Sequence, residues 1–272
     1  MVKYAVMTFM YSGWTDGDDG SHEKLIKIIG DAGATGIEAF ANHFFDNDAL
    51  VKLYISEMKN AGVSMPVMDL LANLAATDKS ERVEEYDKMR KGIDICDALG
   101  AEIVHVAGCR LTGDTTPGDG RKLIAEGLME FVDDIEKRGM TLAVEDFDPS
   151  PTLICSAADC LEIIGLTDNR CKFVFDTGNF EAVGEHAEDN FDKMIDVTCH
   201  FHFKDFAPND SERGYGGTHF GTGMVKNSVV AKKIVDSAYN GWVALESVTQ
   251  YPNGPVDTIP KDLEVLKSMF QQ

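Results

Sequence analysis

Residues 197–205 read V-T-C-H-F-H-F-K-D. The stretch is short and rich in β-branched and aromatic residues, so it predicts a buried β-strand and not an amphipathic helix. Because side chains alternate along a strand, His200, His202 and Lys204 lie on one face. Two imidazoles and an amine on a core strand cost free energy unless another group uses them. The pattern therefore predicts a functional site at this strand.

Three other apolar runs end in carboxylates. The run 141–146 delivers Glu145, 172–176 ends at Asp176, and 241–246 ends at Glu246. One acidic residue after a strand is more often a turn or cap residue, but this explanation does not suit four metal-type side chains after four successive strands. Carboxylates sharing one cavity repel one another without a cation. We therefore expect Glu145, Asp176, His202 and Glu246 to converge on one metal ion.

The donor set of two Glu, one Asp and one His suits a hard or borderline divalent cation. Mn²⁺, Mg²⁺, Co²⁺ and Zn²⁺ all meet this description. Four protein ligands also leave coordination positions for substrate oxygens.

Four further strands, each followed by a helix, precede these runs. They are predicted at 4–9, 36–40, 63–68 and 102–107, although Pro66 argues against a central position for the third. Helices are predicted at 21–33, 47–61, 78–99, 121–137, 156–164, 188–194, 225–239 and 257–270. Strands that alternate with helices pair in parallel, and eight such units predict an α/β fold of the (β/α)8 TIM barrel type in one domain, 1–272.

The alternative fold is an open doubly wound sheet. That fold favours a Gly-rich phosphate loop after the first strand, and G-W-T-D-G-D-D-G at 13–20 lacks the G-x-G-x-x-G spacing. The barrel is therefore the better prediction. Its active site is expected at the carboxyl ends of the strands.

The charge balance excludes some partners. The net charge is −21, with 46 acidic and 25 basic residues, which argues against nucleic acid and against an anionic membrane surface. We find neither a signal peptide nor a membrane-spanning run, so we expect a cytoplasmic protein. The six cysteines form no C-x-x-C pair, which indicates reduced thiols.

Four motifs resemble the xylose-isomerase-like TIM-barrel superfamily, which includes the sugar phosphate isomerase/epimerase family. They are V-E-D at 144–146, F-D-T-G-N-F at 175–180, H-F-H-F-K-D at 200–205 and G-W-V-A-L-E at 241–246. The loop H-F-G-T-G at 219–223 is similar to a Gly-rich loop of that family. The resemblance implies that Glu145, Asp176, His202 and Glu246 bind the metal, with Mn²⁺ as the first expectation.

The resemblance also implies an activity. Glu145 and Glu246 would be the acid/base pair of an isomerase or epimerase that acts on a sugar or keto-polyol through an enediolate that the metal stabilises. A lyase or dehydratase acting on a keto-inositol or keto-glycoside could use the same residues, and a non-catalytic sugar-binding barrel is a third reading. Members of this family are often oligomers, so the resemblance is compatible with a homo-oligomer.

Two departures from the family pattern bear on the substrate. Asn179 stands where ketose epimerases and endonuclease IV have a His, which weakens the ketose 3-epimerase reading. Val106-Ala107-Gly108 replaces the His-Pro-Gly of endonuclease IV, which argues against a three-zinc nuclease. No cluster of Lys and Arg marks a phosphate clamp, which favours an unphosphorylated sugar or ketone.

Other side chains at the strand ends are candidate substrate contacts. We predict His105, Asn179, Lys204 and Trp14 for this role, with His105 equally readable as a buried histidine bonded to backbone. His200 is predicted to be structural, and Glu38 either supports the site or is a turn residue.

Overall fold

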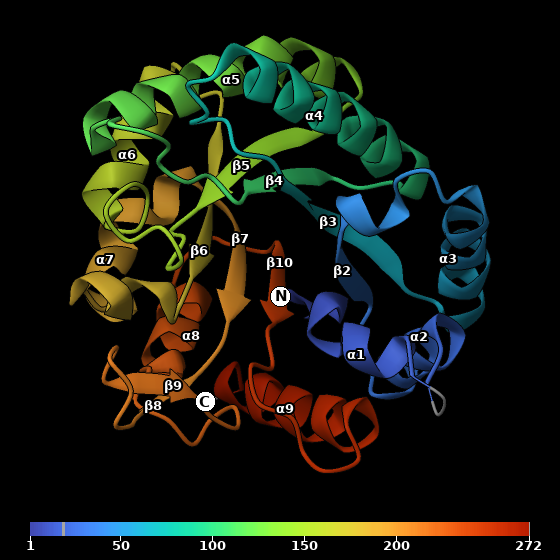
Figure 1. Ribbon diagram of the computed structural model, residues 1–272. Helices are drawn as coiled ribbons and strands as arrows, with labels where there is room; N and C mark the ends of the chain where they lie inside the picture. Colours follow the sequence, from blue (N-terminus) through green and yellow to red (C-terminus); the bar gives the residue numbers. More distant parts are fainter. Residues whose placement is uncertain (18–19, 272) are drawn as a thin grey trace.

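The computed structural model describes residues 1–17 and 20–271, and in these ranges eight parallel strands close into a barrel (Figure 1). The strands pair in the order β1-β10-β7-β6-β5-β4-β3-β2, so the last strand of the chain closes onto the first. This confirms the predicted TIM barrel. The strands are β1 (Lys3–Met7), β2 (Gly36–Phe40), β3 (Ser64–Leu71), β4 (Ile103–Ala107), β5 (Thr141–Glu145), β6 (Lys172–Asp176), β7 (Thr198–Phe203) and β10 (Trp242–Leu245).

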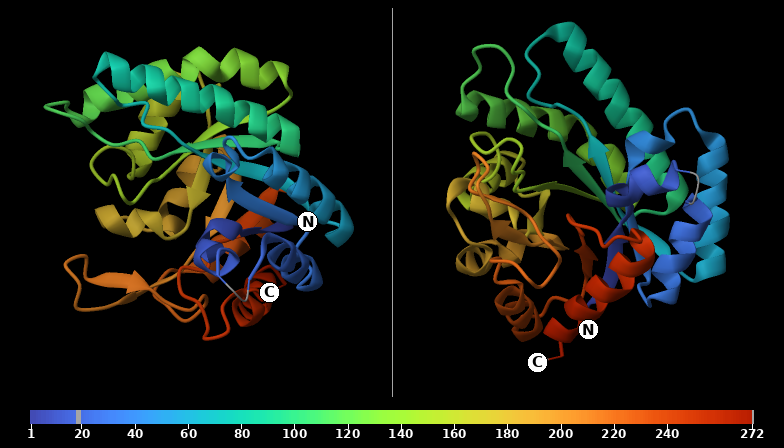
Figure 2. Two further views of the ribbon diagram at one scale, coloured as in Figure 1. Left: turned by 45° about the vertical axis from the view of Figure 1, so that its right-hand side comes forward. Right: turned by 60° about the horizontal axis from the view of Figure 1, so that its bottom comes forward.

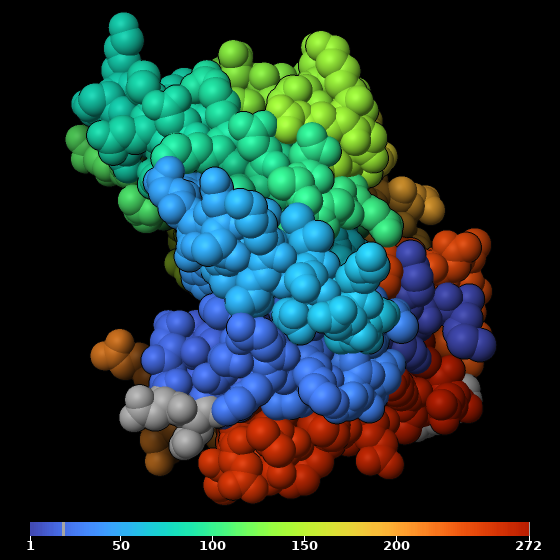
Figure 3. Space-filling model, turned by 90° about the vertical axis from the view of Figure 1, so that its right-hand side faces the viewer, coloured from blue at the N-terminus to red at the C-terminus, as the bar shows by residue number. Residues whose placement is uncertain are grey.

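The helices form a ring outside the strands (Figure 1). The C-terminal segment packs directly against the N-terminal segment, which completes this ring (Figure 3). The long helices are α2 (His22–Asp31), α3 (Asp48–Ala61), α4 (Lys79–Leu99), α5 (Pro117–Lys137), α6 (Ala157–Leu166), α7 (Ala187–Met194), α8 (Asn227–Asp236) and α9 (Pro255–Met269). Shorter helical turns are η1 (Thr8–Tyr11), α1 (Ser12–Thr15), η2 (Ala41–Phe44), η3 (Asn179–Val183) and η4 (Ile195–Val197).

Helix ends follow local sequence signals. The Asp78 side chain accepts hydrogen bonds from the Ser80 and Glu81 amides and begins α4, while Gly100 ends it at φ 75°, a conformation that favours glycine. α5 begins at Pro117, four residues before the predicted start at Arg121. Thr116 caps it and the proline occupies the first turn, where its missing N–H costs nothing.

Pro66 lies in a central strand, contrary to the sequence-based objection. β3 pairs with β2 on one side and β4 on the other, but its register to β2 shifts between Gly36 and Glu38. Ser64 pairs with Gly36 and Val67 pairs with Glu38, so β3 has one more residue than β2 between these two pairs. This bulge interrupts the ladder at Pro66, so the missing amide hydrogen breaks no regular pairing.

The segment between β7 and α8 contains an antiparallel hairpin that sequence reasoning missed. β8 (Phe206–Pro208) pairs with β9 (Tyr215–Gly217), and the rings of Phe206 and Tyr215 lie 5.1 Å apart. The hairpin projects beyond the barrel in Figure 2. Each strand has only three residues, too few for an alternation pattern to be visible in the sequence.

The register of β7 places the functional residues. His202 lies opposite Asp176 of β6 on one side and Ala244 of β10 on the other. Phe201 faces the helices, where its ring lies 6.1 Å from that of Phe191 in α7. His200 and His202 therefore face the barrel interior, as the alternation predicted. Within the described residues, no helix is both long and apolar enough to cross a bilayer.

Candidate metal centre

A cavity of about 200 Å³ opens at the carboxyl ends of the strands. Its wall is partly apolar, with three phenylalanines, and partly ionisable. The structure brings six of the eight predicted site residues to this wall: His105, Glu145, Asn179, His202, Lys204 and Glu246. Asp176 lies at the end of β6, fully buried. Trp14 is not on the wall; it lies beside Gly254, where an added Cβ would be 3.2 Å from its ring.

Glu145, Asp176 and His202 form a buried group in which one ligand atom of each lies within 4.8 Å of the others. His202 Nδ1 is 3.5 Å from Glu145 Oε2 and 3.8 Å from Asp176 Oδ2. The other Asp176 oxygen, Oδ1, accepts hydrogen bonds from the backbone amides of Gly178 and Asn179 at 2.7 and 3.0 Å. These two bonds orient the carboxylate so that Oδ2 faces His202.

Glu246 joins this group through Lys204. The Lys204 ammonium lies 3.0 Å from Glu246 Oε2 and 3.1 Å from Asp176 Oδ2, and its side chain is almost fully buried. Glu246 itself is outside the set of three that meets the 4.8 Å spacing. Its role as a fourth metal ligand remains a prediction.

The residues present fit a divalent cation. His202 Nδ1 and Asp176 Oδ2 are buried and make no hydrogen bond among the described residues, although Lys204 balances the charge of Asp176. Buried polar atoms without a partner are rare in folded proteins. The two atoms lie 3.8 Å apart, and carboxylate oxygens with one imidazole nitrogen are the donor set of Mn²⁺, Mg²⁺, Co²⁺ and Zn²⁺ sites.

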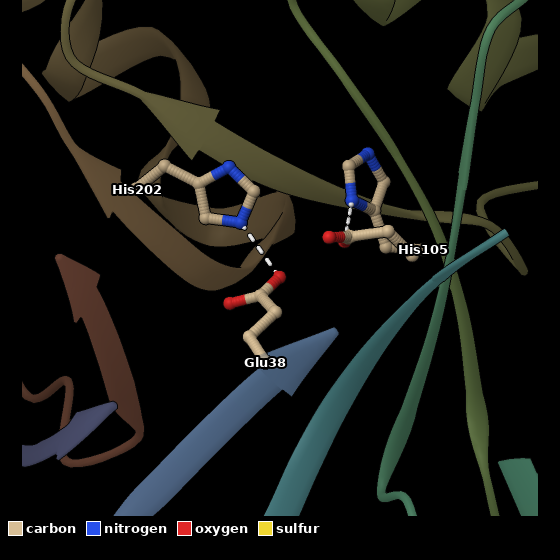
Figure 4. Close-up of side chains that lie close together, drawn as sticks. Glu38, His105 and His202 are labelled. Carbon is tan, nitrogen blue, oxygen red and sulfur yellow. Dashed lines mark hydrogen bonds and ion pairs between the residues drawn. The ribbon is translucent and has the colours of Figure 1, made fainter. Parts of the chain in front are cut away.

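A second buried group lies beneath the first and contains Glu38, Asp69, His105 and His202. Glu38 accepts a hydrogen bond from His202 Nε2 at 2.9 Å (Figure 4), and a second one from His200 Nε2 at the same distance. Asp69 Oδ1 lies 2.7 Å from His105 Nδ1. By spacing and residue type this group, too, is consistent with a metal site.

Sequence reasoning left the role of Glu38 open and did not find its partners. Its partners are 162 and 164 residues away, on a strand that is not its neighbour in the barrel. The available signal was the pair of inward-facing histidines on β7, which needed a buried acceptor.

The ionisable groups shift one another's pKa. Burial alone would raise the pKa of Glu145, but the charges of His105, His202 and Lys204 outweigh it, so this pKa lies below its ordinary value. Burial raises the pKa of Asp176 to about 7, with Lys204 opposing the shift. Burial and the charge of Glu38 raise the pKa of Asp69 to about 8. A carboxylate that stays ionised can act as a base.

Known proteins with similar sequences are sugar epimerases. A model of the xylose isomerase-like TIM barrel family matches residues 26–269. Fructoselysine 3-epimerase of Shigella flexneri is 27% identical over 187 residues, which is 67% of this chain and a little under two thirds (66%) of that protein. L-ribulose-5-phosphate 3-epimerase UlaE of Salmonella typhi is 24% identical over 79% of this chain and 75% of its own.

Solved structures of similar shape cover the whole barrel. D-psicose 3-epimerase from Clostridium cellulolyticum H10, with D-tagatose, superposes with a TM-score of 0.80 over 99% of both chains at 13% identity. 3-Keto-D-glucoside 4-epimerase YcjR from E. coli gives 0.79 over 98% of this chain and 100% of that one, also at 13% identity. At this identity the likeness concerns the fold.

Proposed function

Because the chain belongs to the xylose isomerase-like TIM barrel family, we propose that it is a metal-dependent epimerase or isomerase of an unphosphorylated ketose or sugar-derived ketone. The observation that carries this proposal is the buried group of Glu145, Asp176 and His202 beside a cavity that Glu246 also lines. The sequence relatives named as 3-epimerases support the epimerase part of the proposal. UlaE is named for a sugar phosphate, so the unphosphorylated substrate is argued from the cavity wall alone.

In the proposed reaction, one glutamate takes a proton from the carbon next to the substrate carbonyl. The C–H electron pair becomes the C=C bond of an enediolate, and the carbonyl oxygen gains the negative charge. A divalent ion held by Glu145, Asp176, His202 and Glu246 would supply charge stabilisation for that oxygen. The other glutamate starts the cycle protonated and, in an epimerase, donates its proton to the opposite face of the same carbon as the carbonyl re-forms. In an isomerase the proton goes to the former carbonyl carbon, and the hydroxyl proton of the first carbon moves to the former carbonyl oxygen as the new carbonyl forms.

Lys204, His105 and Asn179 are proposed to hold substrate oxygens. His105 Nε2 and Asn179 Oδ1 have no hydrogen-bond partner in the described part of the chain, and both residues line the cavity. Asn179 Oδ1 can accept a hydrogen bond, and His105 Nε2 can donate or accept one, which suits a polyhydroxylated ligand.

The cavity wall favours a substrate without phosphate. Among the described residues that line it, Lys204 is the one side chain with a permanent positive charge, and two carboxylates already pair with it. Four acidic side chains, Asp69, Glu145, Asp148 and Glu246, share this wall with it, and Asp148 is already paired with Arg213. Phe9, Phe40 and Phe147 offer apolar faces for the C–H side of a sugar.

Exchange of a substrate proton with solvent deuterium tests the proposal. We expect Mn²⁺-dependent exchange at the carbon beside the carbonyl for at least one member of a panel of ketoses and keto-inositols. An elimination product would instead indicate a lyase, and no exchange with any member would favour a sugar-binding barrel.

Glu145→Gln and Glu246→Gln should each lower turnover to product at least about 100-fold, because turnover needs both proton-transfer groups. Glu102→Gln is the matched control, since Glu102 is exposed and precedes β4 at the other end of the barrel. Full turnover in both active-site variants would contradict the acid/base assignment.

A further inference from the structure

The contacts of Glu38 determine which nitrogen of His202 can bind a cation. The two Glu38 oxygens accept from His200 Nε2 and His202 Nε2, each at 2.9 Å, and all three side chains are almost completely buried. Figure 4 shows the Glu38 carboxylate pointing from β2 at the His202 ring. An ionised carboxylate only accepts hydrogen bonds, so both Nε2 atoms carry hydrogen. In the neutral ring the lone pair then lies on Nδ1, which makes Nδ1 the ligating atom; a charged ring would have to lose its Nδ1 hydrogen before it bound a cation.

Glu38 uses both carboxylate oxygens on the two rings: Oε2 bonds to His200 Nε2 and Oε1 bonds to His202 Nε2. Because each oxygen is bonded to a different ring, the carboxylate cannot rotate without breaking one of the two bonds. The ring of His202 is thereby fixed in its plane as well as in its tautomer.

Most of the carboxylate oxygens in the deeper group are already bonded within it. Both Glu38 oxygens are used, and Asp69 Oδ1 is used by His105 Nδ1 at 2.7 Å, so Asp69 Oδ2 is the one carboxylate oxygen of this group without a hydrogen bond among the described residues. Among the described residues the outer nitrogens, His105 Nε2 and His202 Nδ1, also make no hydrogen bond, and each lies 3.5 Å from a Glu145 oxygen. Two imidazoles, each backed by a carboxylate, therefore face the upper group.

We propose that Glu38 is a positioning residue that directs Nδ1 of His202 at the divalent ion, and that the group of Glu38, Asp69, His105 and His202 binds no second ion. This inference rests on the proposed metal centre. Carboxylates that hold a metal-binding imidazole in this way commonly contribute about 10- to 100-fold to metal affinity.

Calorimetric titration of the chelator-treated protein with Mn²⁺ tests both parts. We expect one ion per chain in the wild type, and about 10- to 100-fold weaker binding in Glu38→Gln, because a neutral amide accepts more weakly and cannot accept from both rings. Asp69→Asn is the matched control: it removes a carboxylate from the deeper group but leaves the Glu38–His202 bond, so its affinity should stay within about threefold of the wild type.

Three results would overturn the inference: wild-type affinity in Glu38→Gln, two ions per chain, or an equal loss in Asp69→Asn. If Glu38→Gln does not fold, ¹⁵N spectra of the Zn²⁺-loaded wild type decide, since the inference requires His202 with hydrogen on Nε2 and the reverse tautomer contradicts it. A wild type that binds no divalent ion would instead refute the metal centre of the proposed function.

Discussion

Lys204 is the side chain on which the charge balance of the site depends most. Its ammonium contacts Asp176 and Glu246 at 3.1 and 3.0 Å while almost fully buried. The pKa of Lys204 lies well above its ordinary value. Burial would lower this pKa, but the negative charges of Asp176 and Glu246 raise it by more than burial lowers it. Removing one partner of a buried ion pair costs much free energy, because the charges that remain stay buried without a partner.

Lys204→Met should lower the free energy of unfolding by about 3–5 kcal/mol in the presence of a chelator, since two buried carboxylates lose their cation. Urea denaturation followed by circular dichroism measures the change. Lys232→Met is the control, because its pair with Asp236 is exposed on α8 and should contribute about 0.5 kcal/mol or less. Equal small losses in the two variants would show that Lys204 does not stabilise the site.

At the residue scale, sequence reasoning identified side chains but not all their contacts. The pattern predicted His202, Glu145 and Asp176 as one group, because parallel strands place their carboxyl ends together. It could not predict the bonds of Glu38, because they join β2 to β7, two strands that are not neighbours in the barrel. It also missed the bond between Asp69 and His105, which depends on the register between the neighbouring strands β3 and β4. Trp14 was expected at the substrate, but α1 and the segment near Gly254 place it beside the cavity and not on its wall.

At the element scale, the loop that contains H-F-G-T-G is built around Asp205. Its carboxylate accepts four hydrogen bonds of 2.8–3.2 Å, from the backbone amides of Phe206, Gly221, Gly223 and Val225. An added Cβ at Gly223 would lie 2.1 Å from Asp205 Oδ1, so the close approach requires glycine there. This loop follows Lys204 directly, and it fixes the end of β7 on which the site depends.

Helix α9 is tied to the end of β10 by a second buried acid. Asp262 accepts a hydrogen bond from Ser247 at 2.8 Å, one residue after Glu246. Burial raises the pKa of Asp262 to about 6, above the value of about 3.9 in an unfolded chain. The folded state therefore binds this proton more tightly, and the resulting stability is present below pH 4 and lost as the pH rises through 6.

Asp262→Asn should remove this dependence, because an amide does not titrate. Relative to the wild type, the variant should gain up to about 1 kcal/mol in unfolding free energy between pH 5 and pH 7.5. Urea unfolding at several pH values measures this difference, with Glu264→Gln, exposed on the same helix, as control. A constant difference between Asp262→Asn and the wild type across this range would contradict the raised pKa.

Strand and helix order was predictable, while boundaries and short elements were not. Apolar runs and capping residues gave the eight strands and their helices, because burial and capping act locally. The bulge at Pro66 and the β8–β9 hairpin depend on pairing with distant or very short segments. Such pairing leaves no periodic trace in one sequence.

At the scale of the whole molecule, the closed order of strands explains why residues far apart in sequence share one cavity. β1 pairs with both β2 and β10, so the first and last strands are neighbours. The second half of the chain supplies Glu145, Asp176, His202 and Glu246, whereas the first half supplies Glu38 and Asp69 beneath them. The family and the barrel were accessible from the motifs after β5, β6, β7 and β10; the substrate and the ion were not, because they depend on details of the cavity wall.

The proposed metal centre holds one divalent ion among Glu145, Asp176, His202 and Glu246. A crystal of the Mn²⁺-loaded protein, measured at the manganese absorption edge, tests this directly. We expect a single anomalous peak about 2.0–2.4 Å from His202 Nδ1 and from oxygens of the three carboxylates. A peak among Glu38, Asp69 and His105, or no peak near His202, would contradict it.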